Sequence, residues 1–181
     1  MDNGLLYAYS TIAQALGGAF ALLAAFVLFR LQSLAPVMWE DSNRFRNEFV
    51  RAAMTVLAMV DFQWYDTLRV QGKYVELLAR IAPVVNKAGI QNVFPGEGDF
   101  YLRFQENIRL EEKIIRAFLT ATLFTGATMF GSVAVIPFVH RFSSCESLAM
   151  TVAILGVVAF GLTLWRYWKV MAVTLFGDGA R

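Results

Sequence analysis

The residue types that can support covalent catalysis gather in one short segment, which contains His140, Ser143, Ser144 and Cys145. A nucleophile next to a base is the pair that serine and cysteine hydrolases use. Catalytic geometry is defined in space rather than in sequence, and an exposed loop of about ten residues cannot easily hold a nucleophile, a base and an orienting group together. We interpret the segment as a plain loop and expect no catalytic residue in the chain.

Metal, haem and nucleotide sites lack their usual ligands. The chain has one cysteine and one histidine, too few for a disulfide framework, a Cys/His zinc site or a bis-histidine haem site within one chain. There is no Walker loop, and the segment Gly96-Glu97-Gly98 lacks the third glycine and the preceding strand of a dinucleotide fingerprint. We therefore expect no metal, no cofactor and no small-molecule substrate, and we interpret the chain as non-enzymatic.

Charged residues are scarce and unevenly distributed. Of the 181 residues, 57% are hydrophobic and 17% are charged, and the net charge of +2 gives no field that would attract a nucleic acid. Three runs, residues 3–29, 117–139 and 147–165, contain no Asp, Glu, Lys or Arg. A bilayer core needs about 20 helical residues, and an unclosed segment that crosses it must be a helix to satisfy its own backbone. The sequence therefore predicts three transmembrane helices in contact with membrane lipid.

The stretch between the first two runs, residues 30–116, holds 12 basic and 11 acidic residues, a composition close to that of a soluble domain. The predicted fold class is an all-α integral membrane protein with three transmembrane helices and a cytoplasmic helical domain between the first and the second. We divide the chain into a first transmembrane helix (1–35), a cytoplasmic helical region and loop (36–98), a stalk helix that continues into the second transmembrane helix (99–139), and an outer loop, third transmembrane helix and short cytoplasmic tail (140–181).

Basic residues beside the runs indicate the orientation in the membrane. Those on one side are Arg30, Arg109, Lys113, Arg116, Arg166 and Lys169, whereas the other side has Arg141 and His140. Because lysine and arginine are retained on the cytoplasmic side, we expect the N-terminus outside and the C-terminus in the cytoplasm. We expect a cell membrane, taken here as a bacterial inner membrane.

Aromatic residues near the ends of the runs are expected to be interfacial anchors. These residues lie where the aromatic belt of a membrane protein is placed, and they are Trp39, Trp165 and Trp168 together with Tyr7, Tyr9 and Tyr167. They support the span boundaries and are given no further role.

Turn and cap residues divide the central region into shorter helices. Pro36 is expected to end the first helix or its extension, and the Glu40-Asp41-Ser42 cluster indicates a new N-terminus, so that a second helix runs from about Asn43. The apolar stripe of this helix contains Phe45, Phe49, Ala53, Val56, Val60 and Trp64.

A break at Gly72 precedes another predicted helix, from about Lys73 to Lys87, with Pro83 kinking it or ending its regular part. Its apolar residues are Val75, Leu78, Ile81 and Val85. Residues 89–99 are rich in turn formers and predict a loop, and Asp99 is expected to cap a helix of about 40 residues that enters the second span.

Small residues repeat along the first span. Ala13, Gly17, Ala21 and Ala25 recur every four residues, and Gln14 and Gly18 lie alongside them. Small side chains let helix backbones approach closely in a membrane, so we predict that this helix-packing stripe meets another helix.

Hydroxyl residues form a second stripe, in the second span. Thr125, Thr128 and Ser132 share one side of the predicted helix. Such hydroxyls can line a pore, or they can pack internally by bonding to the carbonyl four residues back or across to Gln14 of the first span, and the sequence leaves both interpretations open.

A group of cations precedes the second span. Arg109, Lys113 and Arg116 follow the spacing i, i+4 and i+7, which places them on one side of a helix just inside the membrane. The sequence predicts either an ordinary solvated face or a set of contacts to lipid headgroups, where each cation attracts anionic lipid by about 1 kcal/mol.

These features favour an interaction protein. We expect a non-enzymatic membrane interaction or scaffold subunit, which assembles with itself as a homo-oligomer or binds a membrane-complex or cytoplasmic partner through its helical domain. The alternative is an oligomeric channel or membrane-permeabilising effector. Because three spans are too few to enclose a water path, such a channel would have to be built by several copies.

Overall fold

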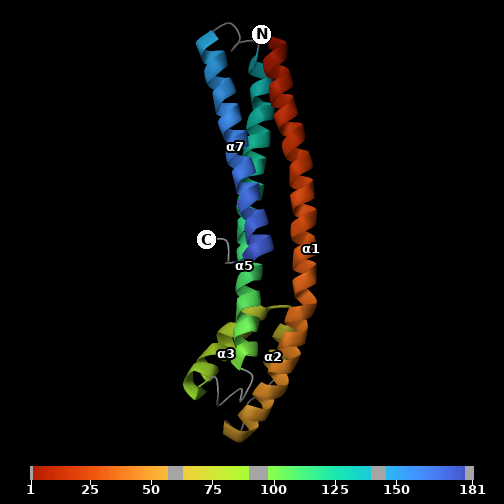
Figure 1. Ribbon diagram of the computed structural model, residues 1–181, viewed down its shortest axis with the longest axis vertical. Helices are drawn as coiled ribbons and strands as arrows, with labels where there is room; N and C mark the ends of the chain where they lie inside the picture. Colours follow the sequence, from red (N-terminus) through yellow and green to blue (C-terminus); the bar gives the residue numbers. More distant parts are fainter. Residues whose placement is uncertain (1, 57–62, 90–97, 140–145, 178–181) are drawn as a thin grey trace. The chain divides into compact units, whose positions relative to one another are not determined.

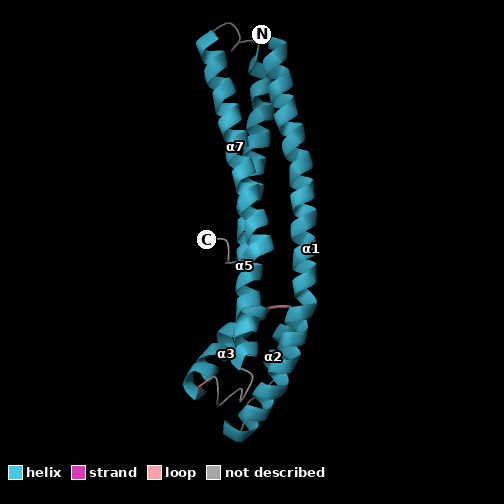
Figure 2. Ribbon diagram, in the orientation of Figure 1, coloured by secondary structure: helices cyan, strands magenta, loops and turns pink. Residues whose placement is uncertain are grey.

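The computed structural model of the chain describes residues 2–56, 63–89, 98–139 and 146–177. Over these ranges it is helical and contains no strand, as predicted (Figures 1 and 2). The helices are α1 (Asp2–Val56), α2 (Gln63–Val70), α3 (Tyr74–Ala88), α5 (Gly98–Val135), the 3-10 turn η1 (Ile136–Phe138) and α7 (Glu146–Phe176).

Three of these helices, α1, α5 and α7, are long and apolar enough to cross a membrane. The apolar stretches cover Leu6–Asn47, Tyr101–Phe138 and Ser147–Phe176. Their length and composition are compatible with residence in a membrane.

The end of the first helix was predicted wrongly. α1 continues through Pro36 to Val56, instead of ending near Pro36 and restarting near Asn43. A proline inside a helix removes one hydrogen bond and costs about 3 kcal/mol. On either side of it, Leu34, Met38 and Phe45 are buried, with 5%, 2% and 0% of their surface exposed. Each such burial is worth about 1.5–3 kcal/mol, which is sufficient to offset the lost hydrogen bond.

The chain divides into two compact units. Unit 1 consists of Met1–Arg30 and Lys113–Arg181, and unit 2 consists of Leu31–Glu112. Helices α1 and α5 each contribute residues to both units, whereas α7 belongs to unit 1 and α2 and α3 belong to unit 2.

Unit 1 packs the first part of α1, the second part of α5 and all of α7 against one another. Phe20 of α1 stacks on Phe118 of α5, with ring centroids 5.7 Å apart. The other buried apolar residues of this unit include Leu16, Leu23, Val27, Ile114, Ala121 and Val170. In α1 the buried positions recur at steps of three, four and seven residues, the period of one helix face.

Unit 2 is built around aromatic rings. The buried Phe45 of α1 lies 6.3 Å from Tyr65, 5.8 Å from Tyr101 and 6.1 Å from Phe104, measured between ring centroids. Tyr74 meets Phe104 edge to face at 6.1 Å. Such aromatic pairs add about 0.5–1.5 kcal/mol each to the value of the buried surface. This cluster connects α1, α2, α3 and α5 within the unit.

The predicted apolar face of α3 was partly wrong. Ile81 and Val85 are fully buried, as their spacing suggests, but Val75 is 53% exposed. Tyr74 and Leu77 occupy the inner face in its place. The helix extends from Tyr74 to Ala88 with Pro83 inside it, close to the predicted limits.

Two other local predictions need correction. The stripe that we drew from Phe45 to Trp64 does not belong to one helix, because Trp64 lies in α2, and Val60 is outside the described residues. Helix α5 begins at Gly98, so Asp99 belongs to its first turn and is not its cap. Residues 90–97 of the predicted loop are also outside the described residues.

Gly72 closes α2 in a left-handed conformation. Its φ is 67°, its N–H donates to the Arg69 carbonyl at 3.0 Å, and the Lys73 N–H donates to the Leu68 carbonyl at 2.9 Å. This pair of bonds is a Schellman motif, which ends a helix and turns the chain sharply. The break predicted at Gly72 is therefore present, and it joins α2 to α3.

We expect Gly72→Ala to lower the free energy of unfolding by about 1–2 kcal/mol, because a Cβ atom is disfavoured at this positive φ. Gly72→Asn should lose less, since asparagine tolerates the left-handed region. Thermal unfolding in detergent measures both variants. Equal stability of wild type and Gly72→Ala would contradict the assigned turn.

Candidate functional site

The predicted hydroxyl stripe lies inside unit 1. Thr125 and Ser132 are only 3% and 4% exposed, and Thr128 is half-buried. Each of the three donates a hydrogen bond to the carbonyl four residues back, at 2.8–2.9 Å. This pattern is the local alternative that hydroxyl residues offer to a helix backbone.

Two of these hydroxyls also reach α7. Thr125 Oγ1 lies 2.7 Å from Tyr167 Oη, and Thr128 Oγ1 lies 3.0 Å from Thr163 Oγ1. We call Thr125, Thr128, Thr163 and Tyr167 the hydroxyl seam. The Thr163 hydroxyl also contacts the Ala159 carbonyl of its own helix. Thr128 and Thr163 together therefore make three contacts, one to each helix's own carbonyl and one to each other, but their hydroxyls carry only two protons. One of them therefore has to donate across to the other helix for that contact to be a hydrogen bond.

Two tyrosines of unit 1, Tyr9 and Tyr167, are not interfacial anchors, whereas Tyr7 is 74% exposed. Tyr9 and Tyr167 are 5% and 6% exposed, and both hydroxyls bond within the unit. Tyr9 of α1 donates to the Val152 carbonyl of α7, and its ring covers Gly156. The anchor prediction was wrong for these two residues, because their rings turn inward to pair their hydroxyls. A tyrosine near the end of an apolar run carries the same sequence signal in either role.

Gly156 leaves room for the Tyr9 ring. A Cβ atom at this position would lie 2.9 Å from Tyr9 Oη, closer than real Cβ atoms come to their neighbours, and 3.0 Å from its Cε1 atom, which is tighter than most real contacts. Beside this contact is a cavity of about 250 Å³, also lined by Thr128, Gly131 and Ser132. Close approach of the ring to α7 therefore depends on the absence of a side chain at residue 156.

The small-residue stripe of α1 is divided between the inside and the outside of unit 1. A Cβ atom on Gly17 would lie 3.6 Å from Met129 Cε of α5, an ordinary packing distance. A Cβ atom on Gly18 would have nothing within 4 Å. Gln14, Ala21 and Ala25 are exposed and Ala13 is half-buried. Only one edge of the stripe thus packs on the chain's own α5, and the rest forms an outward face.

The cations that the sequence predicts either on a solvated face or in contact with lipid headgroups are all exposed. Arg109 belongs to unit 2, whereas Lys113 and Arg116 belong to unit 1. Arg116 also lines a cleft between α5 and α7 together with Arg166 and Lys169, which sequence reasoning treated only as topology signals.

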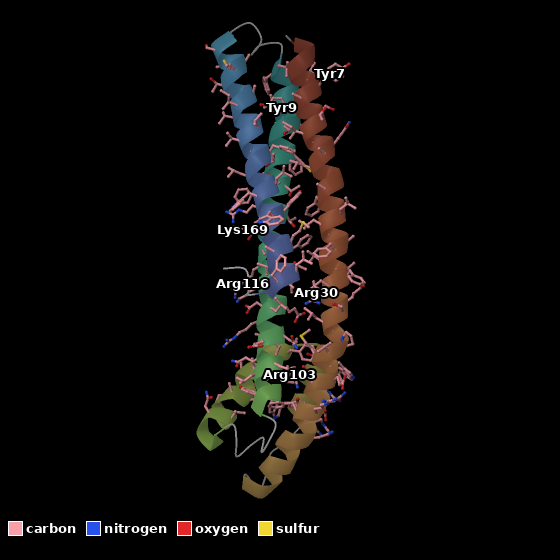
Figure 3. All side chains as sticks on the ribbon, viewed as in Figure 1. Tyr7, Tyr9, Arg30, Arg103, Arg116 and Lys169 are labelled. Carbon is pink, nitrogen blue, oxygen red and sulfur yellow. The ribbon has the colours of Figure 1, made fainter. Side chains whose placement is uncertain are left out.

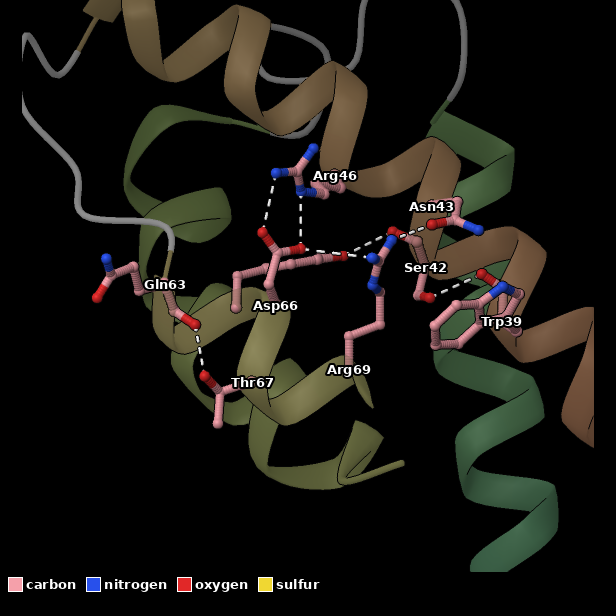
Figure 4. Close-up of polar contacts among 9 residues, drawn as sticks. Trp39, Ser42, Asn43, Arg46, Gln63, Asp66, Thr67 and Arg69 are labelled. Carbon is pink, nitrogen blue, oxygen red and sulfur yellow. Dashed lines mark hydrogen bonds and ion pairs between the residues drawn. The ribbon is translucent and has the colours of Figure 1, made fainter. Parts of the chain in front are cut away.

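A polar network in unit 2 holds α2 against α1 (Figure 4). Arg46 contacts both carboxylate oxygens of Asp66, at 2.8 and 2.9 Å. Arg69 lies 3.5 Å from the same carboxylate and donates to the side chain of Asn43, and its guanidinium stacks 4.7 Å from the centre of the Trp39 ring. Two arginines of different helices thus share one aspartate.

A buried phenol completes this network. Tyr65 is fully buried, and its hydroxyl donates to the Ser42 carbonyl of α1 at 2.8 Å. Burial raises the pKa of Tyr65 far above its ordinary value of 10, so the hydroxyl keeps its proton and remains a donor. Sequence reasoning missed these contacts. The only advance signal was the spacing of Asp66 and Arg69, three residues apart on one predicted helix.

Residues 140–145, which include the possible nucleophiles Ser143, Ser144 and Cys145, are outside the described residues. Among the residues that are described, no group of three or more His, Cys, Asp or Glu side chains is placed to hold a metal ion.

Comparisons with protein-family models, with curated proteins and with solved structures find no match to this chain.

The contact between Tyr9 and Gly156 predicts a difference between two glycines of α7. Gly156→Ala should displace the Tyr9 ring and lower thermal stability in detergent. Gly161→Ala, which meets nothing within 4 Å, should be neutral or stabilising by up to about 1 kcal/mol because alanine favours the helix. The two substitutions are chemically identical, so the difference between them isolates the Tyr9 contact. Equal melting temperatures would show that the ring does not depend on Gly156.

The hydroxyl seam predicts a small effect of Thr128→Val. The substitution removes one interhelical hydrogen bond, which in membrane proteins is worth about 0.6 kcal/mol on average. We expect a slightly lower melting temperature, with unchanged oligomer size and unchanged ion flux across protein-containing vesicles. A change in ion flux at constant expression and oligomer size would instead place Thr128 on a conduction path.

Proposed function

We propose that the protein is a non-enzymatic interaction or scaffold subunit of a membrane, which assembles with a second copy of itself through the outward face of α1. The observation that carries this proposal is the exposure of Gln14, Gly18, Ala21 and Ala25 on a helix whose opposite face is buried in unit 1.

The exposed carboxamide of Gln14 would favour association of this face, because a second copy can supply a hydrogen-bond partner. Lipid chains offer no hydrogen-bond partner, so an amide that faces them remains unsatisfied until another polar group approaches. Gly18, four residues further along, and Ala21 and Ala25 on the same outward face allow a second backbone to come close. In a symmetric pair the same face of both copies meets, so two Gln14 side chains can bond to each other.

Unit 2 supplies a second surface for assembly or for a cytoplasmic partner. Val70 at the end of α2 is 71% exposed, and Val75 at the start of α3 is 53% exposed. Val70 and Val75 flank the turn at Gly72, so one exposed apolar side chain lies on each side of the turn between α2 and α3. The distribution of basic residues supports the N-terminus outside, and unit 2 and the C-terminus in the cytoplasm of a bacterial inner membrane.

The alternative function, an oligomeric channel or permeabilising effector, has less support. A water path would have to expose Thr125, Thr128 and Ser132. These hydroxyls are engaged with their own helix, and Thr125 and Thr128 also contact α7. We therefore prefer the scaffold, whose interface residues are already on the surface.

The test is the oligomeric state of Gly18→Leu in nanodiscs. Because a side chain at Gly18 meets nothing within the chain, the variant should fold normally. A leucine there would hold a second copy away, and we expect the dissociation constant of the oligomer to rise at least about tenfold, or about 1.4 kcal/mol. Single-molecule photobleaching at several protein-to-lipid ratios measures this constant.

Gly161→Leu is the matched control, since Gly161 is also an exposed helical glycine with nothing within 4 Å. It should leave the dissociation constant unchanged. A wild-type chain that remains monomeric at every protein-to-lipid ratio would rule out self-assembly through α1.

A further inference from the structure

A basic cleft lies between α5 and α7 within unit 1. It has a volume of about 170 Å³ and is lined by Arg116, Ala117, Thr120, Arg166, Lys169 and Val170. Three of these side chains are cationic and none is a carboxylate. Figure 3 shows Arg116 and Lys169 on the same side of the two helices.

The register of the two helices places the cations of α7 beside an apolar segment. Thr128 lies opposite Thr163 and Thr125 opposite Tyr167, so α5 and α7 are antiparallel. Counting on from these pairs, Lys169 is level with residues 122–123 of α5. The uncharged run of α5 begins at Ala117, so Lys169 lies roughly 9 Å inside that run at 1.5 Å per residue. Arg166 lies deeper still.

Arg166 and Lys169 alternate with Trp165 and Trp168, whose rings are typical of the headgroup level, so these two cations lie at the edge of the apolar run of α7, where anionic lipid is attracted. Arg166 stacks 4.7 Å from the centre of the Phe124 ring, and the Lys169 ammonium lies 5.6 Å from the centre of the Trp165 ring. Ring faces attract a cation but leave its charge in place.

The shape and the surroundings of the cleft select the anion. Ala117 and Val170 give it an apolar lining, and the Thr120 hydroxyl donates to the Arg116 carbonyl at 2.8 Å, so the cations supply the hydrogen-bond donors for a ligand. Trp165 and Trp168 stand next to it and are 56% and 59% exposed, as expected of side chains that contact lipid near its headgroups. A ligand with a phosphate and acyl chains matches this combination.

We propose that the cleft binds the phosphate group of an anionic membrane lipid, with Arg166 and Lys169 as its main ligands and Arg116 at the mouth. The guanidinium supplies a fork of donors for the phosphate oxygens, and the ammonium supplies a point charge. This site is independent of self-assembly through α1, and it would make the subunit select its lipid neighbours.

The test measures lipid retained by the full chain from nanodiscs of phosphatidylcholine that contain a minor fraction of phosphatidylglycerol. Native mass spectrometry gives the ratio of bound anionic to bound zwitterionic lipid. Removing a cation near the membrane surface weakens anionic-lipid binding about fivefold (~1 kcal/mol), so the preference should fall roughly 25-fold in the double variant Arg166→Gln/Lys169→Gln. The single variant Lys169→Gln should lose about fivefold, and it keeps the test informative if the double variant does not fold.

The control Arg44→Gln/Arg80→Gln removes the same charge from two exposed arginines of unit 2 and should retain the wild-type preference. Lys169→Arg should also retain it, because the charge is kept. An unchanged preference in the cleft variants, or an equal loss in the unit 2 control, would overturn the proposal. Inorganic phosphate is added in a separate arm. If phosphate binding is lost in the cleft variants while their preference for phosphatidylglycerol is unchanged, the site takes free phosphate and the assignment to lipid is wrong.

Discussion

A polar group that water cannot reach has to find its hydrogen-bond partner within the protein, and unit 1 depends on this constraint. The hydroxyls of Thr125, Thr128 and Ser132 lie on its inner side and donate to carbonyls of their own helix. These bonds alone add no attraction between helices. The contacts to Tyr167 and Thr163 turn the same groups into a connection between α5 and α7. Tyr9 connects α1 to α7 in the same way. Each such bond is worth little, so the role of the seam is to set the register in which apolar surfaces pack.

Among the residues of unit 1 that the structure describes, a carboxamide of α1 and a cation of α7 depart from this constraint, and both lie on the surface. The Gln14 carboxamide is exposed on α1, and Lys169 stands beside the apolar run of α5. A protein that paired all of its polar groups internally would have no polar contact left to offer to a neighbour. These departures are therefore where the chain's interactions are to be sought. Their chemistry differs, since an amide is satisfied by an equivalent amide in a second copy, whereas a cation requires an anion.

The sequence was sufficient for the helical class and for three long apolar helices, because runs without charge are a local signal that needs no knowledge of packing. It failed where a tertiary contact outweighs a local rule. Pro36 has the strongest local tendency to end a helix, yet the burial of Met38 and Phe45 carries α1 past it. The hydroxyl stripe was found but its use was not, since a serine or threonine pattern is identical for a pore and for a packed seam. The partners that decide between them, Tyr167 and Thr163, are 35 to 42 residues away.

Unit 2 shows why the remaining contacts were out of reach of sequence reasoning. α2 has eight residues, and an isolated helix of that length is not stable in water. It exists because Tyr65 is buried against α1 and because Arg46 and Arg69 both meet Asp66. Exposed ion pairs contribute at most about 1 kcal/mol, so the energy comes mainly from the aromatic core, and the arginines determine the orientation that α2 adopts on α1. Val70, an exposed apolar residue at the surface of unit 2, is the last residue of α2. Its position therefore depends on Tyr65, Asp66 and Arg69, which fix α2 on α1 but are not part of that exposed surface.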